Sequence, residues 1–152
     1  MTDPADPADP ADLASGPPLA DDAGSGETRV TTGPFGQFLG FRLVRADEDG
    51  AVMEADPLPE HLNGGGILHG GYLSALLDST TGWAVHGILP AGVAAPHVSL
   101  TVQFVRAARP GTTLVCRGRC IKAGRRIGAA EAEITQGDRV IARAVSSHAV
   151  LG

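Results

Sequence analysis

The sequence contains little cysteine, few aromatic residues and no long apolar run. Its two cysteines, Cys116 and Cys120, cannot build a disulfide framework, and both are expected to be small core residues. No run approaches the ~18 apolar residues that a membrane span needs. The start of the chain lacks the basic and apolar regions of a secretory signal. These absences argue against a membrane protein and a disulfide-rich secreted domain, and we expect a cytoplasmic protein.

Large side chains are also scarce, because aromatic residues make up 4% of the chain while glycine occurs 21 times. A core of small residues closes tightly but buries limited apolar area per residue. At 152 residues the chain has the length of one domain. Such a domain is large enough to fold alone and would gain stability by oligomerising.

Positive charge is missing from the first 27 residues, which hold seven acids and neither Lys nor Arg. The rest of the chain holds 10 acids and 12 bases, so the net charge of -5 belongs to the leader and the body carries +2. That excess is too weak to indicate a nucleic-acid partner. Asp-Pro-Ala occurs three times in residues 3–11, which predicts a disordered acidic leader over residues 1–28. An acidic docking arm is the alternative. Residues 29–152 are the predicted domain.

One segment of that domain has helical spacing, and six have the character of strands. The helix is predicted over residues 70–89, where apolar residues recur every three or four positions until Pro90. The predicted strands cover residues 41–46, 51–55, 98–104, 114–121, 127–135 and 139–150. Hairpin-length turns join the first two strands and the last three, so the last three should form an antiparallel meander. The fold class is α+β, with one long central helix wrapped by a curved antiparallel sheet.

A glycine-rich loop precedes the helix and contains one amide side chain, Asn63. The helix then opens on His69-Gly70-Gly71, although glycine is a poor helix former. Glycines leave backbone N–H groups bare in the first turn, where they have no partner in the helix and the positive end of its dipole lies. That arrangement binds anions, or the oxyanion that develops on a carbonyl. The alternative is a tight strand-to-helix turn in which glycine only permits close packing.

Asp78 follows Leu76 and Leu77 in the middle of this apolar helix. Because an unpaired buried charge is costly, we expect either a carboxylate used as base or nucleophile, or the N-cap of a second helix beginning at Ser79. Gly70 and Asp78 lie about 12 Å apart along one helix, too far to contact one carbonyl group. If both act, each site combines Gly70 of one chain with Asp78 of another. A two-fold dimer with antiparallel helices achieves this.

In this spacing, Asn63, Gly66, His69-Gly70-Gly71 and Asp78 resemble the signature of hotdog-fold acyl-CoA thioesterases of the phenylacetate-degradation (PaaI) type. The resemblance extends over roughly residues 33–151. It implies a hotdog fold and hydrolysis of acyl-CoA to free acid and CoA. It also implies a homodimer with a continuous sheet, often paired into a homotetramer, with active sites between protomers.

The same resemblance implies roles for single residues. The N–H of Gly70 looks like the oxyanion donor, helped by Gly71, and Asp78 looks like the catalytic carboxylate. Asn63 is similar to the amide that positions the thioester carbonyl or the attacking water. His69 is expected to shape the loop or to contact the substrate carbonyl.

Some relatives carry further polar groups near the acid. Where they have a hydroxyl one turn later, this chain has Gly82 beside Thr81. Others place a polar residue at the start of the next strand, where His97 or Ser99 could serve.

The phosphates of CoA call for a basic patch, and the resemblance favours the turn between the first and second strands of the meander. Lys122, Arg125 and Arg126 are the first candidates, and Arg106 and Arg109 come next. Solvated charges at a hairpin turn are the alternative. The acyl group, which we expect to be aromatic or of short or medium chain, would lie near the helix. Its pocket is expected to include Tyr72, Trp83 and Phe104.

Other chemistries lack their motifs. No pair of histidines has the spacing of a zinc motif, no Gly-Lys-Ser/Thr follows the glycines, and no Gly-x-Ser-x-Gly elbow is present. We therefore expect neither a metal nor a cofactor. The His-Phe-Pro-type motif of hotdog dehydratases is also missing. A non-catalytic acyl-CoA-binding or sensing module on the same fold is the main alternative function.

Overall fold

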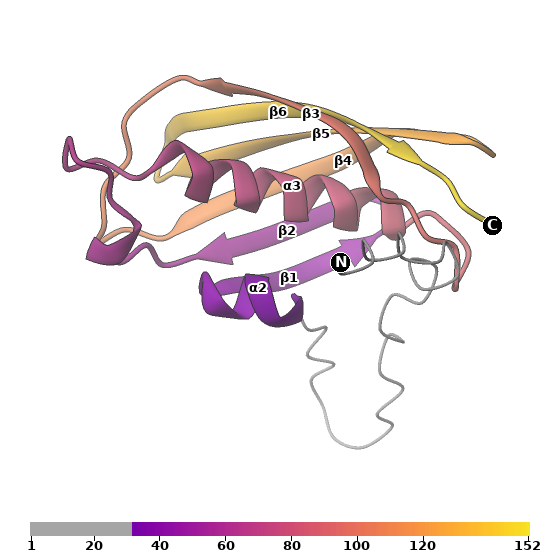
Figure 1. The fold of residues 1–152 in the computed structure, drawn as a ribbon, viewed down its shortest axis with the longest axis horizontal. Helices are drawn as coiled ribbons and strands as arrows, with labels where there is room; N and C mark the ends of the chain where they lie inside the picture. The colour runs from indigo at the N-terminus through magenta and orange to yellow at the C-terminus, as the bar shows by residue number, and fades with distance from the viewer. Residues whose placement is uncertain (1–31) are drawn as a thin grey trace, which may run out of the picture.

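One long helix lies along a single six-stranded sheet (Figure 1). The computed structural model describes residues 32–152, so the predicted leader of residues 1–28 lies outside the described residues. The elements in chain order are α2 (Gly33–Phe38), β1 (Phe41–Asp47), β2 (Gly50–Ala55), the 3-10 turn η1 (Pro59–His61), α3 (Gly70–His86), β3 (His97–Phe104), β4 (Leu114–Ala123), β5 (Ile127–Gln136) and β6 (Arg139–Ala149). Within the described range, no helix has the length and apolar character to cross a membrane.

The sheet is antiparallel throughout, in the order β1-β2-β4-β5-β6-β3. The predicted β1–β2 hairpin and the β4–β5–β6 meander are both confirmed. The chain leaves β2 through α3 and returns as β3 on the opposite edge of the sheet. One long helix on a curved antiparallel sheet is the predicted α+β architecture, so the fold-class prediction is correct.

The helix packs on the sheet through the predicted apolar stripe. Leu73, Leu76, Leu77 and Ala84 are all buried, and the polar member of the stripe, Thr80, is fully buried with them. Small residues of the sheet allow this close approach, as the alanines of β5 predicted. A Cβ added at Gly118 of β4 would lie 3.0 Å from both Cγ2 and the carbonyl oxygen of Thr80.

The helix ends at His86, three residues before the predicted end. At Gly87 the backbone passes so close to the β1–β2 turn that a Cβ would lie 2.5 Å from the carbonyl oxygen of Asp47. Glycine is therefore required at this position, which is the C-cap of the helix. Ile88, counted in the predicted stripe, is 43% exposed as a result.

Strand β3 departs from the simple alternation that its sequence predicts. The register against β6 shifts between His97 and Ser99, so Val98 sits in a bulge and is 69% exposed. A bulge moves the preceding residue to the other face of the strand. His97 therefore joins Leu100 and Val102 on the side that faces α3, instead of sharing the outer face with Ser99.

Candidate active site

The loop before α3 is organised by Asn63. Its side-chain oxygen accepts hydrogen bonds from the N–H of Gly65 (2.8 Å) and the N–H of Ile67 (3.4 Å). The backbone closes the same loop, because the N–H of Asn63 donates to the Ile67 carbonyl at 2.8 Å. These donors fix the orientation of the amide. Its NH₂ group donates no hydrogen bond within residues 32–152 and stays available to a ligand.

His69 forms the N-cap of α3. Its backbone is extended, with φ −63° and ψ 136°, and its Nδ1 accepts from the N–H of Gly71 at 2.8 Å. In the neutral ring the proton therefore lies on Nε2, which is an exposed donor. This bond satisfies one of the bare N–H groups of the first turn. The N–H of Gly71 therefore already has an acceptor in His69, whereas the N–H of Gly70 has no acceptor in the described part of the chain.

Asp78 lies in the middle of one continuous helix. The alternative that it caps a second helix beginning at Ser79 is wrong, because α3 runs unbroken from Gly70 to His86. The Asp78 side chain is 51% exposed, so its charge is not buried among the apolar residues of the helix. Gly70 and Asp78 are confirmed as members of one helix, and they are separated by about 12 Å along its axis.

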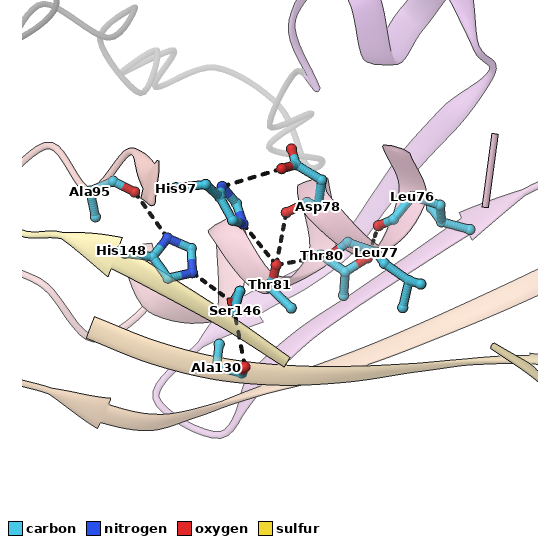
Figure 2. A network of polar contacts seen from close by, with 10 residues as sticks. All are labelled: Leu76, Leu77, Asp78, Thr80, Thr81, Ala95, His97, Ala130, Ser146 and His148. Carbon is cyan, nitrogen blue, oxygen red and sulfur yellow. Dashed lines mark hydrogen bonds and ion pairs between the residues drawn. The ribbon is translucent and has the colours of Figure 1, made fainter. Parts of the chain in front are cut away.

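The carboxylate of Asp78 faces the imidazole of His97, which lies between the acid and Thr81 (Figure 2). Nδ1 of His97 lies 3.4 Å from Oδ1 of Asp78, and Nε2 lies 2.9 Å from Oγ1 of Thr81. Burial lowers the pKa of His97, while the nearby Asp78 carboxylate acts to raise it. The net effect favours the neutral ring.

A second histidine, His148, packs against the ring of His97. The ring centroids of His97 and His148 are 4.1 Å apart, and the two residues are paired across β3 and β6. His148 is fully buried, with Nδ1 3.1 Å from the Ala95 carbonyl and Nε2 2.8 Å from Oγ of Ser146. A carbonyl only accepts, so Nδ1 carries a hydrogen. Burial is the main cause that lowers the pKa of His148.

Sequence reasoning did not single out His148 or Ser146 as functional residues. The available signal was the inward phase of β6, because both follow Ala142 and Ala144 in steps of two. Polar residues at positions that alternation assigns to the core need partners. Thr81, noted beside Gly82, is likewise fully buried and contacts the ring of His97.

The remaining predicted residues fall into separate places. Ser99 lies on the outer face, where its hydroxyl pairs with that of Ser147 at 2.7 Å, so it does not meet Asp78. Lys122, Arg125 and Arg126 are exposed at the β4–β5 turn. That turn lies at the end of the sheet where Gly128 pairs with His148.

Arginine also reaches the glycine loop, from the opposite end of the sheet. Arg109 donates from Nη1 to the Gly66 carbonyl at 3.2 Å, whereas Arg106 donates to the Val140 carbonyl at 3.1 Å. Of these secondary candidates for phosphate contact, Arg109 is the one beside the loop that carries Asn63.

A hollow of about 280 Å³ adjoins the amino-terminal end of α3. It is lined by apolar and aromatic side chains together with Glu60, His69 and Gly71. Tyr72, a predicted pocket residue, forms part of its wall and stacks on His61, with ring centroids 4.1 Å apart. Burial raises the pKa of Tyr72 to about 12. Trp83 and Phe104, the other two predicted pocket residues, are not in this lining.

Among residues 32–152 no group of three or more His, Cys, Asp or Glu side chains is placed to hold a metal ion.

Comparison with known proteins gives consistent matches. The family model described as "Thioesterase superfamily" matches residues 65–142, which include Gly70, Asp78 and His97. The protein PA0474 of Pseudomonas aeruginosa, whose name provisionally calls it an esterase, is 33% identical over 112 residues, 73% of this chain and 84% of that protein. Acyl-coenzyme A thioesterase PaaI of Escherichia coli (strain K12) is 30% identical over 96 residues, 63% of this chain and 66% of that protein.

Solved structures agree with these sequence matches. The conserved protein PA5202 from Pseudomonas aeruginosa superposes with a TM-score of 0.75 at 28% identity, covering 78% of this chain and 94% of that one. The Escherichia coli PaaI structure superposes with a TM-score of 0.72 at 25% identity, covering 78% of this chain and 84% of that one. The chain belongs to the thioesterase superfamily, is of the PaaI type, and has the hotdog fold.

Proposed function

We propose that the protein is an acyl-CoA thioesterase that releases a free acid and CoA. The observation that carries this proposal is one helix presenting both a backbone N–H without an acceptor, at Gly70, and a half-exposed carboxylate, at Asp78. The first is suited to an oxyanion and the second to a base or nucleophile. The name of the relative PaaI supports CoA as the thiol component.

The chemistry follows from these groups. A thioester carbonyl lacks the resonance of an amide and is readily attacked. The tetrahedral oxyanion would be stabilised by the N–H of Gly70 and by the positive end of the α3 dipole. The free NH₂ of Asn63 and the Nε2–H of His69 belong to the same end of the helix and are suited to orient the carbonyl.

The proposed site is shared between two protomers of a homodimer or of a homotetramer made from two dimers. Gly70 and Asp78 are too far apart along α3 to act on one carbonyl, so the Asp78 of one protomer would complete the site that begins at Gly70 of the partner subunit. Strand β3 lies at the edge of the sheet and exposes Val98 and Phe104, which supports edge-to-edge pairing into a continuous sheet.

The CoA phosphates would be held by exposed basic side chains at the β4–β5 turn, Lys122, Arg125 and Arg126. For the acyl group, the hollow of about 280 Å³ beside His69 and Gly71 is the proposed pocket. It suits an aromatic acyl group or an aliphatic chain of short or medium length.

The test is release of free thiol from a panel of aromatic, short-chain and medium-chain acyl-CoAs. We expect turnover by the wild type and a loss of at least about 100-fold in kcat for Asp78→Asn, with circular dichroism unchanged. Asp138→Asn is the matched control, because Asp138 is an exposed acid in the β5–β6 turn. An Asp78→Asn variant that hydrolysed acyl-CoA as fast as the wild type would overturn the proposal. Binding of acyl-CoA by a wild type that releases no thiol would favour the non-catalytic binding module.

A further inference from the structure

The side chains of Asp78, His97 and Thr81 form a line of carboxylate, imidazole and hydroxyl, with His97 in the middle (Figure 2). In hydrolases that use this order, the hydroxyl is the exposed nucleophile. Here the exposure is reversed, because Thr81 is fully buried while the Asp78 side chain is 51% exposed. The carboxylate is therefore the end of the line that can meet a substrate, and the hydroxyl is its buried anchor.

The single hydroxyl hydrogen of Thr81 determines which nitrogen of His97 is protonated. Oγ1 of Thr81 lies 2.9 Å from the carbonyl oxygen of Leu77 and 3.0 Å from that of Asp78. Carbonyl oxygens only accept, and a helical threonine commonly donates to the carbonyl one turn back. The neighbouring Thr80 does so at 2.7 Å, to Leu76, with no histidine beside it.

With its hydrogen turned into the helix, Thr81 offers His97 a lone pair. Nε2 of His97, 2.9 Å away, must then be the nitrogen that carries the hydrogen. The neutral ring is left with a bare Nδ1, which faces Oδ1 of Asp78 at 3.4 Å. Two hydrogen-bond acceptors thus lie side by side at the exposed end of the line.

The surroundings keep His97 neutral in this arrangement. The titratable groups that face it are Asp78 and His86 from α3 and His148 from β6. Burial and His86 lower the pKa of His97 and only Asp78 raises it. His148 donates from Nδ1 to Ala95 and can accept at Nε2 from Ser146, so its neutral ring is satisfied and holds the plane of His97.

We propose that His97 is the proton partner of Asp78, and that Nδ1 of His97 and Oδ1 of Asp78 together bind the attacking water through its two hydrogens. This inference rests on the proposed thioesterase function. The water oxygen forms a bond to the thioester carbon, the carbonyl electron pair moves to the oxygen, and the released proton goes to the Asp78–His97 pair. The oxyanion electron pair then re-forms the carbonyl as the C–S bond breaks, and the departing thiolate takes the proton from the pair and leaves as the free thiol. The pair returns to its starting state, and no other reactant is consumed.

The first test substitutes His97. His97→Gln can still donate to Thr81 but has no basic atom at the position of Nδ1. We expect kcat to fall by about 100-fold with little change in KM. In the wild type, kcat/KM should fall at low pH as the pair gains a proton, and that limb should change in His97→Gln. An unchanged pH profile would show that His97 has only a structural role and would overturn the proposal.

The second test uses the two adjacent threonines as a matched pair. Thr81→Val removes the acceptor that holds Nε2–H, so kcat should fall, whereas Thr80→Val removes the same kind of helix contact without touching His97 and should keep kcat. Equal loss in both variants would indicate damage to packing rather than to the proton partner. A loss confined to Thr81→Val supports the proposal.

Two measurements separate this inference from the proposed function. Nitrogen-15 NMR of the histidine side chains should show neutral His97 protonated at Nε2, whether or not any substrate is turned over. The Nδ1–H form would overturn the inference. Single-turnover hydrolysis in heavy-oxygen water should leave no label on Asp78, because water attacks the substrate directly. Label on the Asp78 carboxylate would show direct attack by the acid and would also overturn it, while leaving the thioesterase function intact.

Discussion

The first turn of α3 and the middle of the same helix present functional groups that are positioned in different ways. At the first turn, the bare N–H of Gly70 and the capping ring of His69 are placed by residues next to them in the chain. In the middle, Asp78 meets His97 from β3, and His97 in turn rests on His148 from β6. Backbone donors come from local geometry, whereas the environment of the carboxylate requires the sheet to be assembled.

The two regions also differ in burial. His69 and Gly71 are exposed, so their hydrogen bond competes with water. Thr81 and His148 are fully buried, and a buried polar group that loses its partner pays the full cost of desolvation. Disturbing the first turn should therefore affect catalysis with little effect on stability. Disturbing the buried histidines should affect both.

The largest expected effect is the removal of the Gly70 N–H by Gly70→Pro. Proline is well tolerated at the first position of a helix, and the extended backbone of His69, with ψ 136°, suits a residue before proline. The fold should persist while kcat falls by about 100- to 1,000-fold, as for loss of one oxyanion donor. Kinetics of acyl-CoA hydrolysis would measure this.

Gly70→Ala is the matched control for that variant, because it adds a Cβ but keeps the N–H. The new Cβ would lie 3.1 Å from Cζ of Phe104, the end of a side chain that is 57% exposed and free to shift. Equal loss of kcat in both variants would mean that crowding, and not the missing donor, disables the first turn.

Next in size is the pH dependence of stability that the middle of the helix imposes. Burial is the first cause lowering the pKa values of His97 and His148. Below their unfolded pKa of about 6.5 the unfolded chain binds more protons than the folded one, so the free energy of unfolding falls as pH drops from there through the folded pKa values. Each unit of pKa difference corresponds to about 1.4 kcal/mol.

Urea unfolding between about pH 7.5 and pH 5.5 covers the range in which histidine titrates. His148→Gln should flatten this dependence, because it removes one of the two buried titrating groups. A slope as steep as that of the wild type would contradict the assignment of His148 as a buried neutral ring.

The smallest expected effect concerns the cap of α3. His69→Ala leaves the N–H of Gly71 without its acceptor and should lower the free energy of unfolding by about 1 kcal/mol. His69→Asn should restore most of that loss, because an amide oxygen is a good N-cap acceptor. If alanine and asparagine gave equal stability, the cap would contribute nothing and His69 would be there for the substrate alone.

Much of the fold was predictable because its periodicities are local. The strand alternation and most of the helical stripe, up to Ala84 but not Ile88, appear in the sequence, and the structure confirms the α+β architecture. The need for glycine at Gly87, where α3 ends, was not predictable because it comes from the passing backbone of Asp47, a contact between distant segments. The roles of Asn63 and Asp78 stay predictions from the residue pattern.

By itself the sequence determined where the helix begins and which groups its first turn leaves free, because glycines and an N-cap act within a few residues. It also determined that an acid occurs two turns into that helix. Only the tertiary structure decided what the acid faces. Simple alternation puts His97 on the outer face of β3 beside Ser99, and the bulge at Val98 turns it toward Asp78. A bulge is fixed by the register against β6, and register depends on the packing of the whole sheet on the helix.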